Sequence, residues 1–308
     1  MPWFKRTRRE IAALCVEAGQ VHALRVARGR GVRPRVVFSR SQPVGDDLVA
    51  TLSGLRASLA LQKLQCTTVM AQGLSRLLAV EAPKVAPEEL REAVRWRLNE
   101  LLEYSPEAAV VDTLPMTIDL EGHVHATTLH VVAAERTQVA ALAAPFFQAG
   151  IPLASIDVVE MAMRNVAALF AEAEAGVAFT WFREGGSGIV FIAHGELCMV
   201  RQFDSGAGDA ASALATGDLR TLERIELGLQ RAIDHFERNF SGVPINQLLL
   251  APFPGAPQLA AHLSAHVSLP VRAVDLSGVL DIAAAPDLAD PARANQMLLS
   301  LGAALRQP

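Results

Sequence analysis

The residues most suggestive of chemistry are glycines and one serine in two short segments. Gly206-Ala207-Gly208-Asp209-Ala210-Ala211 matches G-x-G-x-x-A, a pattern that binds dinucleotide phosphates when it follows a strand of a βαβ unit. The strands predicted before it form an antiparallel meander, so we do not expect a dinucleotide site. Gly185-Gly186-Ser187-Gly188-Ile189 departs from the nucleophile elbow G-x-S-x-G at its last position, which argues against a hydrolase of that type.

Histidines offer a second kind of chemistry, which is metal ligation. His123, His125 and His130 lie near one predicted pair of strands, and His262 and His266 are four residues apart on a predicted helix. Neither group has a nearby cysteine or a recognisable third ligand. The three cysteines show no metal-binding spacing and are too few for a disulfide framework. We therefore expect no metal site.

Length and composition indicate a two-lobed protein without a nucleic-acid surface. The chain has 308 residues, of which 51% are hydrophobic and 19% charged, and this length exceeds what one hydrophobic core usually holds. The net charge of -4 and the aromatic content of 5% argue against nucleic-acid binding, which needs a basic face and stacking platforms. No segment reaches the ~18 apolar residues of a membrane-spanning helix. We expect a cytoplasmic protein.

The elements that must position the glycine segments follow the same order twice. In each half, a meander of three predicted strands precedes alternating helices and strands. The first meander comprises 11–16, 21–27 and 35–39, and the second comprises 177–182, 189–193 and 197–203. The second half also contains a long predicted helix with an apolar stripe at helical spacing: Leu222, Ile225, Leu229, Ile233, Phe236 and Phe240. This duplication is the topology of the actin-like fold.

A predicted helix at 88–102 adds a surface of mixed character to the first half. Leu90, Val94, Leu98, Leu101 and Leu102 give the helix an apolar stripe. The helical spacing favours core packing for Trp96 as well. The neighbouring arginines are expected to form a solvated face.

Four motifs, in this order and at this spacing, carry a more specific resemblance. They are Ala93-Val94-Arg95-Trp96 with Leu101-Leu102-Glu103-Tyr104, Ile156-Asp157-Val158-Val159-Glu160-Met161-Ala162-Met163-Arg164, Ile225-Glu226-Leu227-Gly228-Leu229-Gln230-Arg231-Ala232-Ile233-Asp234, and Leu301-Gly302-Ala303-Ala304-Leu305-Arg306. Together they resemble the PilM/MshI family of actin-like proteins, which serve type IV pilus biogenesis, including the MSHA type. The GspL cytoplasmic domain is similar more distantly, but GspL proteins carry a spanning helix and a periplasmic tail, which we do not expect in this chain.

The resemblance implies an α/β, actin-like fold, in which a ribonuclease H-like unit is duplicated in two lobes. The first lobe would comprise residues 1–175, with an inserted subdomain at about 83–150. The second lobe would comprise 176–308, and the C-terminal helix at about 292–306 would return to the first lobe.

The resemblance also implies a function as a cytoplasmic scaffold, peripheral at the inner-membrane face. The scaffold would bind the cytoplasmic N-terminal tail of a bitopic PilN-like inner-membrane protein, in a groove beside the inserted subdomain. Arg91, Arg95, Trp96 and Leu98 are the candidate contacts. Contacts with the pilus assembly ATPase and the platform, and a homodimer, remain open. No nucleic-acid partner is implied.

In actin-like ATPases, one hairpin turn of each lobe holds the phosphates of ATP, and an aspartate in each turn helps to hold Mg²⁺. The residues at the first turn are Glu17, Gly19 and Gln20, and those at the second are Arg183, Gly185, Gly186 and Ser187. The serine and threonine cluster of the first turn and the aspartate of the second are absent. The resemblance therefore implies a vestigial nucleotide site and no catalytic residues. The alternative hypothesis is an active ATP-binding switch or ATPase, in which Arg183 pairs with a phosphate.

Overall fold

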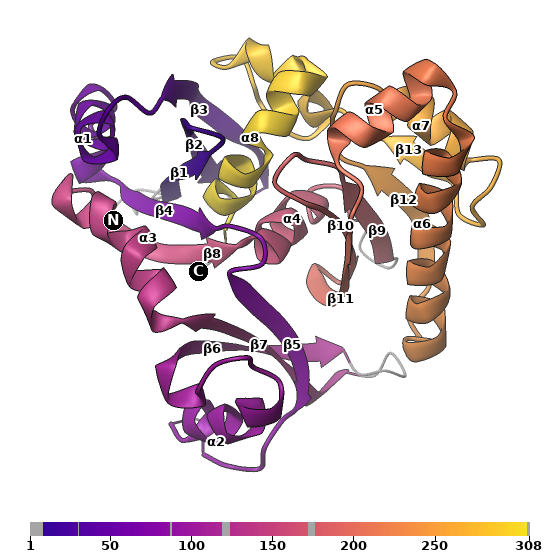
Figure 1. Cartoon of the computed structure of the whole chain (residues 1–308), viewed down its shortest axis with the longest axis horizontal. Coiled ribbons are helices and arrows are strands. Elements are labelled where there is room, and N and C mark those ends of the chain that lie inside the picture. Colours follow the sequence, from indigo (N-terminus) through magenta and orange to yellow (C-terminus); the bar gives the residue numbers. More distant parts are fainter. Residues whose placement is uncertain (1–8, 30, 87, 119–123, 172–175, 307–308) are drawn as a thin grey trace, which may run out of the picture.

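Two five-stranded sheets of the same topology frame the molecule (Figure 1). The computed structural model describes residues 9–29, 31–86, 88–118, 124–171 and 176–306. The first sheet contains, in spatial order, β3 (Val32–Pro43), β2 (Gln20–Gly29), β1 (Arg9–Glu17), β4 (Gln65–Met70) and β8 (Leu153–Val158). The second contains β11 (Glu196–Phe203), β10 (Ser187–Ala193), β9 (Gly176–Trp181), β12 (Ile245–Leu250) and β13 (Val271–Ala273).

Strand direction repeats from one sheet to the other. In each sheet the first three strands of the lobe form an antiparallel meander, and the first strand then pairs in parallel with the fourth. The fifth strand pairs in parallel with the fourth, as β8 does with β4 and β13 with β12. The predicted duplication and the actin-like fold are thereby confirmed.

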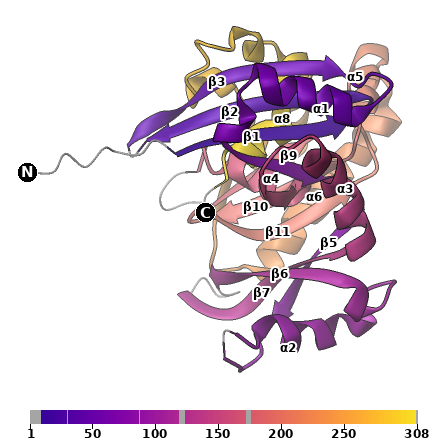
Figure 2. The ribbon, with the colours of Figure 1, turned by 90° about the vertical axis from the view of Figure 1, so that its left-hand side faces the viewer.

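A third, smaller sheet lies below the first lobe (Figure 2). Its strands are β5 (Ser75–Glu81), β7 (Val124–Glu135) and β6 (Ala109–Ile118), all antiparallel. Val94 and Leu98 of α2 (Leu90–Arg97) and the turn after it pack against this sheet. The unit starts before the 83–150 range of the inserted subdomain, because β5 precedes that range and was not foreseen as a strand. The next helix, α3 (Arg136–Gln148), lies inside the range but packs against the first lobe.

Helices cover the outer face of each large sheet. On the first sheet, α1 (Leu48–Ser58) and α3 bury Leu52, Leu55 and Phe146 against β1 and β2. On the second sheet, the outer helices are α5 (Ala207–Thr216), α6 (Leu219–Asn239) and α7 (Ala256–Leu263). The apolar stripe predicted for 222–240 is buried along α6 and its C-cap. The spacing of the stripe therefore predicted both the helix and its buried face correctly.

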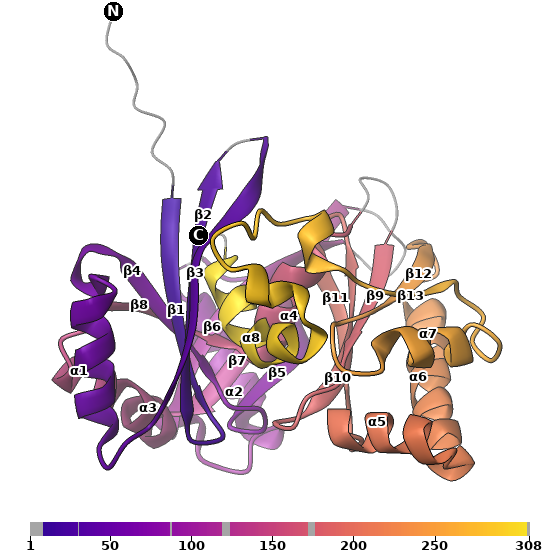
Figure 3. The same cartoon turned by 90° about the horizontal axis from the view of Figure 1, so that it is seen from above.

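Two helices lie between the sheets and join the lobes (Figure 3). They are α4 (Val159–Ala167) and α8 (Pro291–Ala304), and α8 packs on β1, β2 and β4 of the first lobe. Their side chains share one core with both sheets, as Met163 and Leu298 do with Leu24 of β2 and Phe179 of β9. The C-terminal helix thus connects the last part of the chain to the first.

The crossing of α4 and α8 requires glycine. A β-carbon on Gly302 would lie 2.2 Å from the carbonyl oxygen of Ala162, which is closer than any side chain permits. The same crossing is fixed by Asn165, whose Nδ2 donates to the carbonyl oxygen of Gly302 at 3.0 Å.

Aspartates begin several helices by accepting hydrogen bonds from free backbone N–H groups. Asp47 caps α1 through Val49 and Ala50, at 3.0 and 3.1 Å, and Asp218 and Asp290 cap α6 and α8 in the same way.

The helix predicted at 88–102 is shorter than expected, because the chain tightens into a 3-10 turn after Arg97. Short 3-10 helices in the described residues are η1 (Leu61–Lys63), η2 (Leu98–Glu100), η3 (Pro106–Ala108), η4 (Leu276–Gly278) and η5 (Pro286–Ala289). Among the described residues, no helix combines the length and the apolar character that crossing a membrane would require.

Candidate functional site

Two hairpin turns, one from each lobe, meet between the large sheets. In the first lobe, Ala18 and Gly19 join β1 to β2 with positive φ angles of 46° and 73°, as a tight type I′ hairpin requires. In the second lobe, residues 182–186 join β9 to β10, and Gly186 has a φ of 129°. A β-carbon on Gly186 would lie 2.3 Å from Oε1 of Gln72, so the second turn packs directly against the first lobe.

An ion pair joins the two turns. Nη2 of Arg183 donates to both carboxylate oxygens of Glu17, at 2.6 and 2.5 Å. The side chain of Arg183 is 7% exposed and that of Glu17 is 22% exposed. Because both groups are largely removed from water, their attraction is screened less than that of a surface pair. The two residues that sequence reasoning assigned separately to the two phosphate turns therefore bind each other.

Further hydrogen bonds hold the second turn in place. The Ser187 hydroxyl accepts from the backbone N–H of Arg183 at 3.3 Å, inside the turn. From α8, Nδ2 of Asn295 donates to the carbonyl oxygens of Phe182 and Pro252, both at 2.8 Å. The segment after β12, where an adenosine-binding turn would lie in an actin-like ATPase, is thus tied to the second turn through α8.

A cleft of about 710 Å³ remains between the lobes. Four of the predicted nucleotide-site residues line it: Glu17, Gln20, Arg183 and Gly185. The other three do not line the cleft: Gly19 and Gly186 belong to the same turns, and Ser187 is the first residue of β10. The two turns named in the sequence analysis therefore lie at one cleft, and the charged side chains of Glu17 and Arg183 pair with each other there.

The charges at the cleft set its chemistry. A phosphate that bound Arg183 through Nη2 would have to displace the carboxylate of Glu17. Nε of Arg183 is buried and has no hydrogen-bond partner among the described residues. A magnesium ion is usually held by carboxylates. Glu17 is already engaged with the guanidinium, and Glu184 is the other carboxylate that lines the cleft.

The glycine segment at 206–211 forms the start of α5. Ala207 and Gly208 line the cleft, and the carboxylate of Asp209 accepts from the backbone N–H of Gly206 at 2.9 Å. The preceding strand, β11, is the antiparallel edge of its sheet. The segment therefore has no βαβ setting, as the sequence analysis expected, and its own aspartate occupies one N–H group of the helix start.

The thiols and two of the histidines are buried. All three cysteines are buried, and burial raises the pKa of the Cys15 thiol to about 12 and that of Cys66 to about 11. Burial also lowers the pKa values of His22 and His130. Nε2–H of His130 donates to the carbonyl oxygen of Leu197 at 2.7 Å and so joins the small sheet to the second lobe. His123 and the side chain of His125 lie outside the described residues.

Some of the candidate partner-binding residues lie at the surface, and one lies in the core. Trp96 is 74% exposed, so the expectation of core packing for it was wrong. Leu98 is fully buried against the small sheet, and it therefore cannot contact a partner as was predicted. Arg91 pairs with Asp112 at 3.0 Å, and Arg95 pairs with Glu92 one turn earlier on α2 at 2.9 Å. The arginines and Trp96 remain available at the surface.

Sequence reasoning also missed a cluster on the outer face of the second lobe. His262 and His266 meet Glu226 of α6, which lies 36 residues before His262 in the chain. The spacing of the two histidines was visible in the sequence, but only the packing of α6 beside α7 supplies the carboxylate.

Solved structures resemble this chain over almost its full length. One, from the PilM–PilN type IV pilus biogenesis complex, has a TM-score of 0.72 and 18% identity, and the match covers 98% of this chain and 100% of that chain. A Bacteroides thetaiotaomicron protein with an actin-like ATPase fold and unknown function has a TM-score of 0.50 and 9% identity, with 97% and 98% covered. The cytoplasmic domain of EpsL, an inner-membrane component of the type II secretion system of Vibrio cholerae, has a TM-score of 0.50 and 11% identity, with 97% and 96% covered.

No protein-family model matches the sequence, and no curated protein sequence matches it. At identities this low, similarity establishes the fold alone. The likeness to PilM-type proteins, and more distantly to a type II secretion cytoplasmic domain, is thus confirmed as a likeness of structure.

Proposed function

We propose that this chain is a non-catalytic, actin-like scaffold of a type IV pilus or MSHA-type assembly machine. It binds the cytoplasmic N-terminal tail of a bitopic PilN-like inner-membrane protein, and this contact holds it at the cytoplasmic face of that membrane. The observation that carries the proposal is the full-length structural similarity to a chain of the PilM–PilN complex. That similarity spans the inserted small sheet as well as both lobes.

The charges of the interlobe cleft support a role without catalysis. Glu17 and Arg183 pair with each other, so the first turn offers Mg²⁺ no unpaired carboxylate. The second turn carries Arg183 next to Glu184, the other acidic residue that lines the cleft. We infer that the site is vestigial and that Mg²⁺–ATP is not a cofactor.

The surface of α2 supports a role in binding a partner. Trp96 is exposed on a helix that also carries Arg91 and Arg95, and tryptophan and arginine are the residues most enriched at interface hot spots. Leu101, shortly after the helix, is also exposed.

A peptide-binding measurement tests the proposal. A fluorescent peptide with the N-terminal cytoplasmic sequence of the cognate PilN-like protein is titrated with the full chain, and binding is followed by anisotropy. We expect Trp96→Ala to weaken binding by about 10-fold or more, as for a hot-spot residue. Leu219→Ala, which removes an exposed apolar side chain from the second lobe, should leave binding unchanged.

Two results would contradict different parts of the proposal. If the parent chain fails to bind the peptide at high micromolar concentration, the scaffold function is wrong. If the parent binds and Trp96→Ala binds equally well, the tail is captured elsewhere and only the assignment of α2 is wrong.

A second function, an ATP-binding switch or ATPase, is favoured by one observation. The cleft is large enough for a nucleotide, and Nε of Arg183, which lines it, is buried without a hydrogen-bond partner in the part of the chain that the structure describes. A ligand that binds only the folded state raises the melting temperature. The scaffold proposal expects no rise with saturating Mg²⁺–ATP, and a clear rise would favour the switch.

A further inference from the structure

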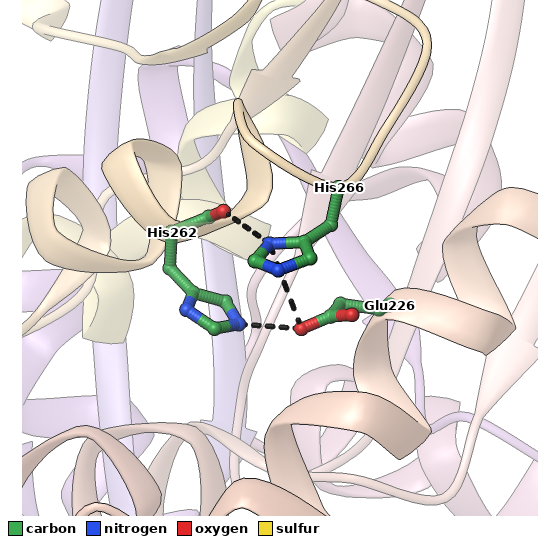
Figure 4. Close-up of side chains that lie close together, drawn as sticks. All are labelled: Glu226, His262 and His266. Atoms are coloured by element: carbon green, nitrogen blue, oxygen red, sulfur yellow. Dashed lines mark hydrogen bonds and ion pairs between the residues drawn. The ribbon is translucent and has the colours of Figure 1, made fainter.

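Three potential metal ligands converge on the outer face of the second lobe, away from the interlobe cleft. His262 lies on α7, His266 follows that helix directly, and Glu226 projects from the middle of α6. Figure 4 shows both imidazole rings and the carboxylate directed toward one point. We propose that Glu226, His262 and His266 bind a divalent transition-metal ion of the zinc class and so clamp α7 to α6.

The distances fit such an ion after a small adjustment. Nε2 of His262 lies 2.5 Å from Oε1 of Glu226, and Nδ1 of His266 lies 4.0 Å from the same oxygen. One potential ligand atom from each residue lies within 4.8 Å of the others. Tetrahedral zinc with bonds of about 2.0–2.1 Å places neighbouring ligand atoms roughly 3.3 Å apart. The carboxylate oxygen would need to move by less than about 1 Å, which a side-chain torsion provides.

Local contacts already hold the two histidines. Nδ1–H of His266 donates to the carbonyl oxygen of His262 at 2.9 Å, and the ring centroids are 4.7 Å apart. Nε2–H of His262 donates to Glu226. An ion bound to Nε2 of His262 takes the lone pair of the tautomer whose ring proton lies on Nδ1, so the hydrogen bond to Glu226 is replaced by two bonds to the metal. Protons compete with the ion for the imidazole nitrogens, so binding weakens as the pH falls. Coordination through Nδ1 of His266 likewise replaces its bond to the carbonyl oxygen.

The three side chains are only partly buried, so a water molecule can reach an ion bound between them. The side chains of Glu226, His262 and His266 are 17%, 24% and 47% exposed. Three protein ligands with access to water on one side are typical of a zinc ion with a water molecule in the fourth position. Two imidazoles and a carboxylate suit zinc, cobalt or nickel, whereas magnesium and calcium prefer oxygen ligands throughout.

Titration of the metal-free full chain with Zn²⁺ tests this site. We expect one Zn²⁺ per chain by calorimetry, a higher melting temperature with Zn²⁺, and a tetrahedral absorption spectrum with Co²⁺. Glu226→Gln and His262→Ala should each weaken Zn²⁺ binding by about 100-fold or more, since loss of a supporting contact alone costs 10–100-fold. Mg²⁺ should not compete.

Matched controls lie on the same helix. Glu223→Gln removes an exposed carboxylate of α6, and His235→Ala removes a histidine of α6, so neither should change Zn²⁺ binding. Failure of the parent chain to bind one Zn²⁺ overturns the proposal. Undiminished binding by Glu226→Gln and His262→Ala overturns it as well, because the ion would then lie elsewhere. Neither result bears on capture of a peptide tail by α2.

Discussion

Removing either partner of the Glu17–Arg183 pair tests whether the two lobes are held together by charge. Glu17→Ala leaves a guanidinium that is 7% exposed without its counter-ion. Loss of one partner of a buried pair destabilises a protein by about 3–5 kcal/mol. The adjoining cleft of about 710 Å³ lets water reach the edge of the site, so we expect about 2–3 kcal/mol.

The reverse change should be milder, and this asymmetry is the sharper part of the prediction. Arg183→Met keeps an apolar stem in place and leaves Glu17, which is 22% exposed and can be hydrated at the cleft. We expect a destabilisation of about 1 kcal/mol, and about 2 kcal/mol for the double variant, in which no charge is left unpaired. The coupling energy of the cycle is then about 1–2 kcal/mol.

Urea denaturation of the four proteins supplies the measurement. Trp181 is fully buried in β9 beside the second turn, so its fluorescence reports on the region that the pair stabilises. Raising the salt concentration should change the coupling little, because a buried pair is screened weakly. A coupling below about 0.5 kcal/mol, as exposed ion pairs show, would refute the view that this pair fixes the lobes.

Two further substitutions probe the shared core and a buried carboxyl. Gly302→Ala forces a β-carbon to within 2.2 Å of the Ala162 carbonyl oxygen, and it should cost about 3 kcal/mol or more in urea denaturation. Gly54→Ala, where a β-carbon meets nothing within 4 Å, should stabilise α1 by up to about 1 kcal/mol, and equal effects would contradict the crossing described. Burial raises the pKa of Asp157 from 3.8 to about 6, so its protonated form stabilises the fold below the unfolded pKa, and that stability is lost as the pH rises through about 6. The free energy of unfolding of Asp157→Asn should therefore be about 1–3 kcal/mol higher than that of the parent at pH 8, and this difference should disappear at pH 4. A difference that does not change with pH would exclude the carboxyl as its cause.

Local sequence patterns were sufficient for most of the fold. The two meanders and the stripe of α6 have periods that short windows reveal, and both are observed. β5 was missed because Leu77, Leu78, Ala79 and Val80 form a short apolar run without alternation. Its assignment depends on pairing with β7, whose residues follow about fifty positions later.

Helix geometry alone would have predicted that Trp96 is exposed, but the apolar stripe around it led to the prediction of core packing. Val94 and Leu98 face the small sheet, and Trp96 is two residues from each. Two residues correspond to about 200° of rotation around a helix, so a side chain at that position points away from the sheet.

The charged sites could not be read from local pattern in the same way. Glu17 and Arg183 are 166 residues apart, and each was judged only against the phosphate turn of its own lobe. The carboxylate that joins His262 and His266 lies on a different helix. In both cases the residue types were visible, and only the packing of distant elements shows which charges meet.

The direct contact between the two turns links the two lobes through side chains of the protein itself. In actin-like ATPases both turns grip one nucleotide, so the nucleotide itself links the lobes. Here Glu17 and Arg183 link the same turns, Gln72 packs against the second turn, and Asn295 ties that turn to α8. A frame whose lobes are linked by its own side chains suits the proposed scaffold, because the surface that holds a partner's tail then keeps one geometry whether or not ATP is present.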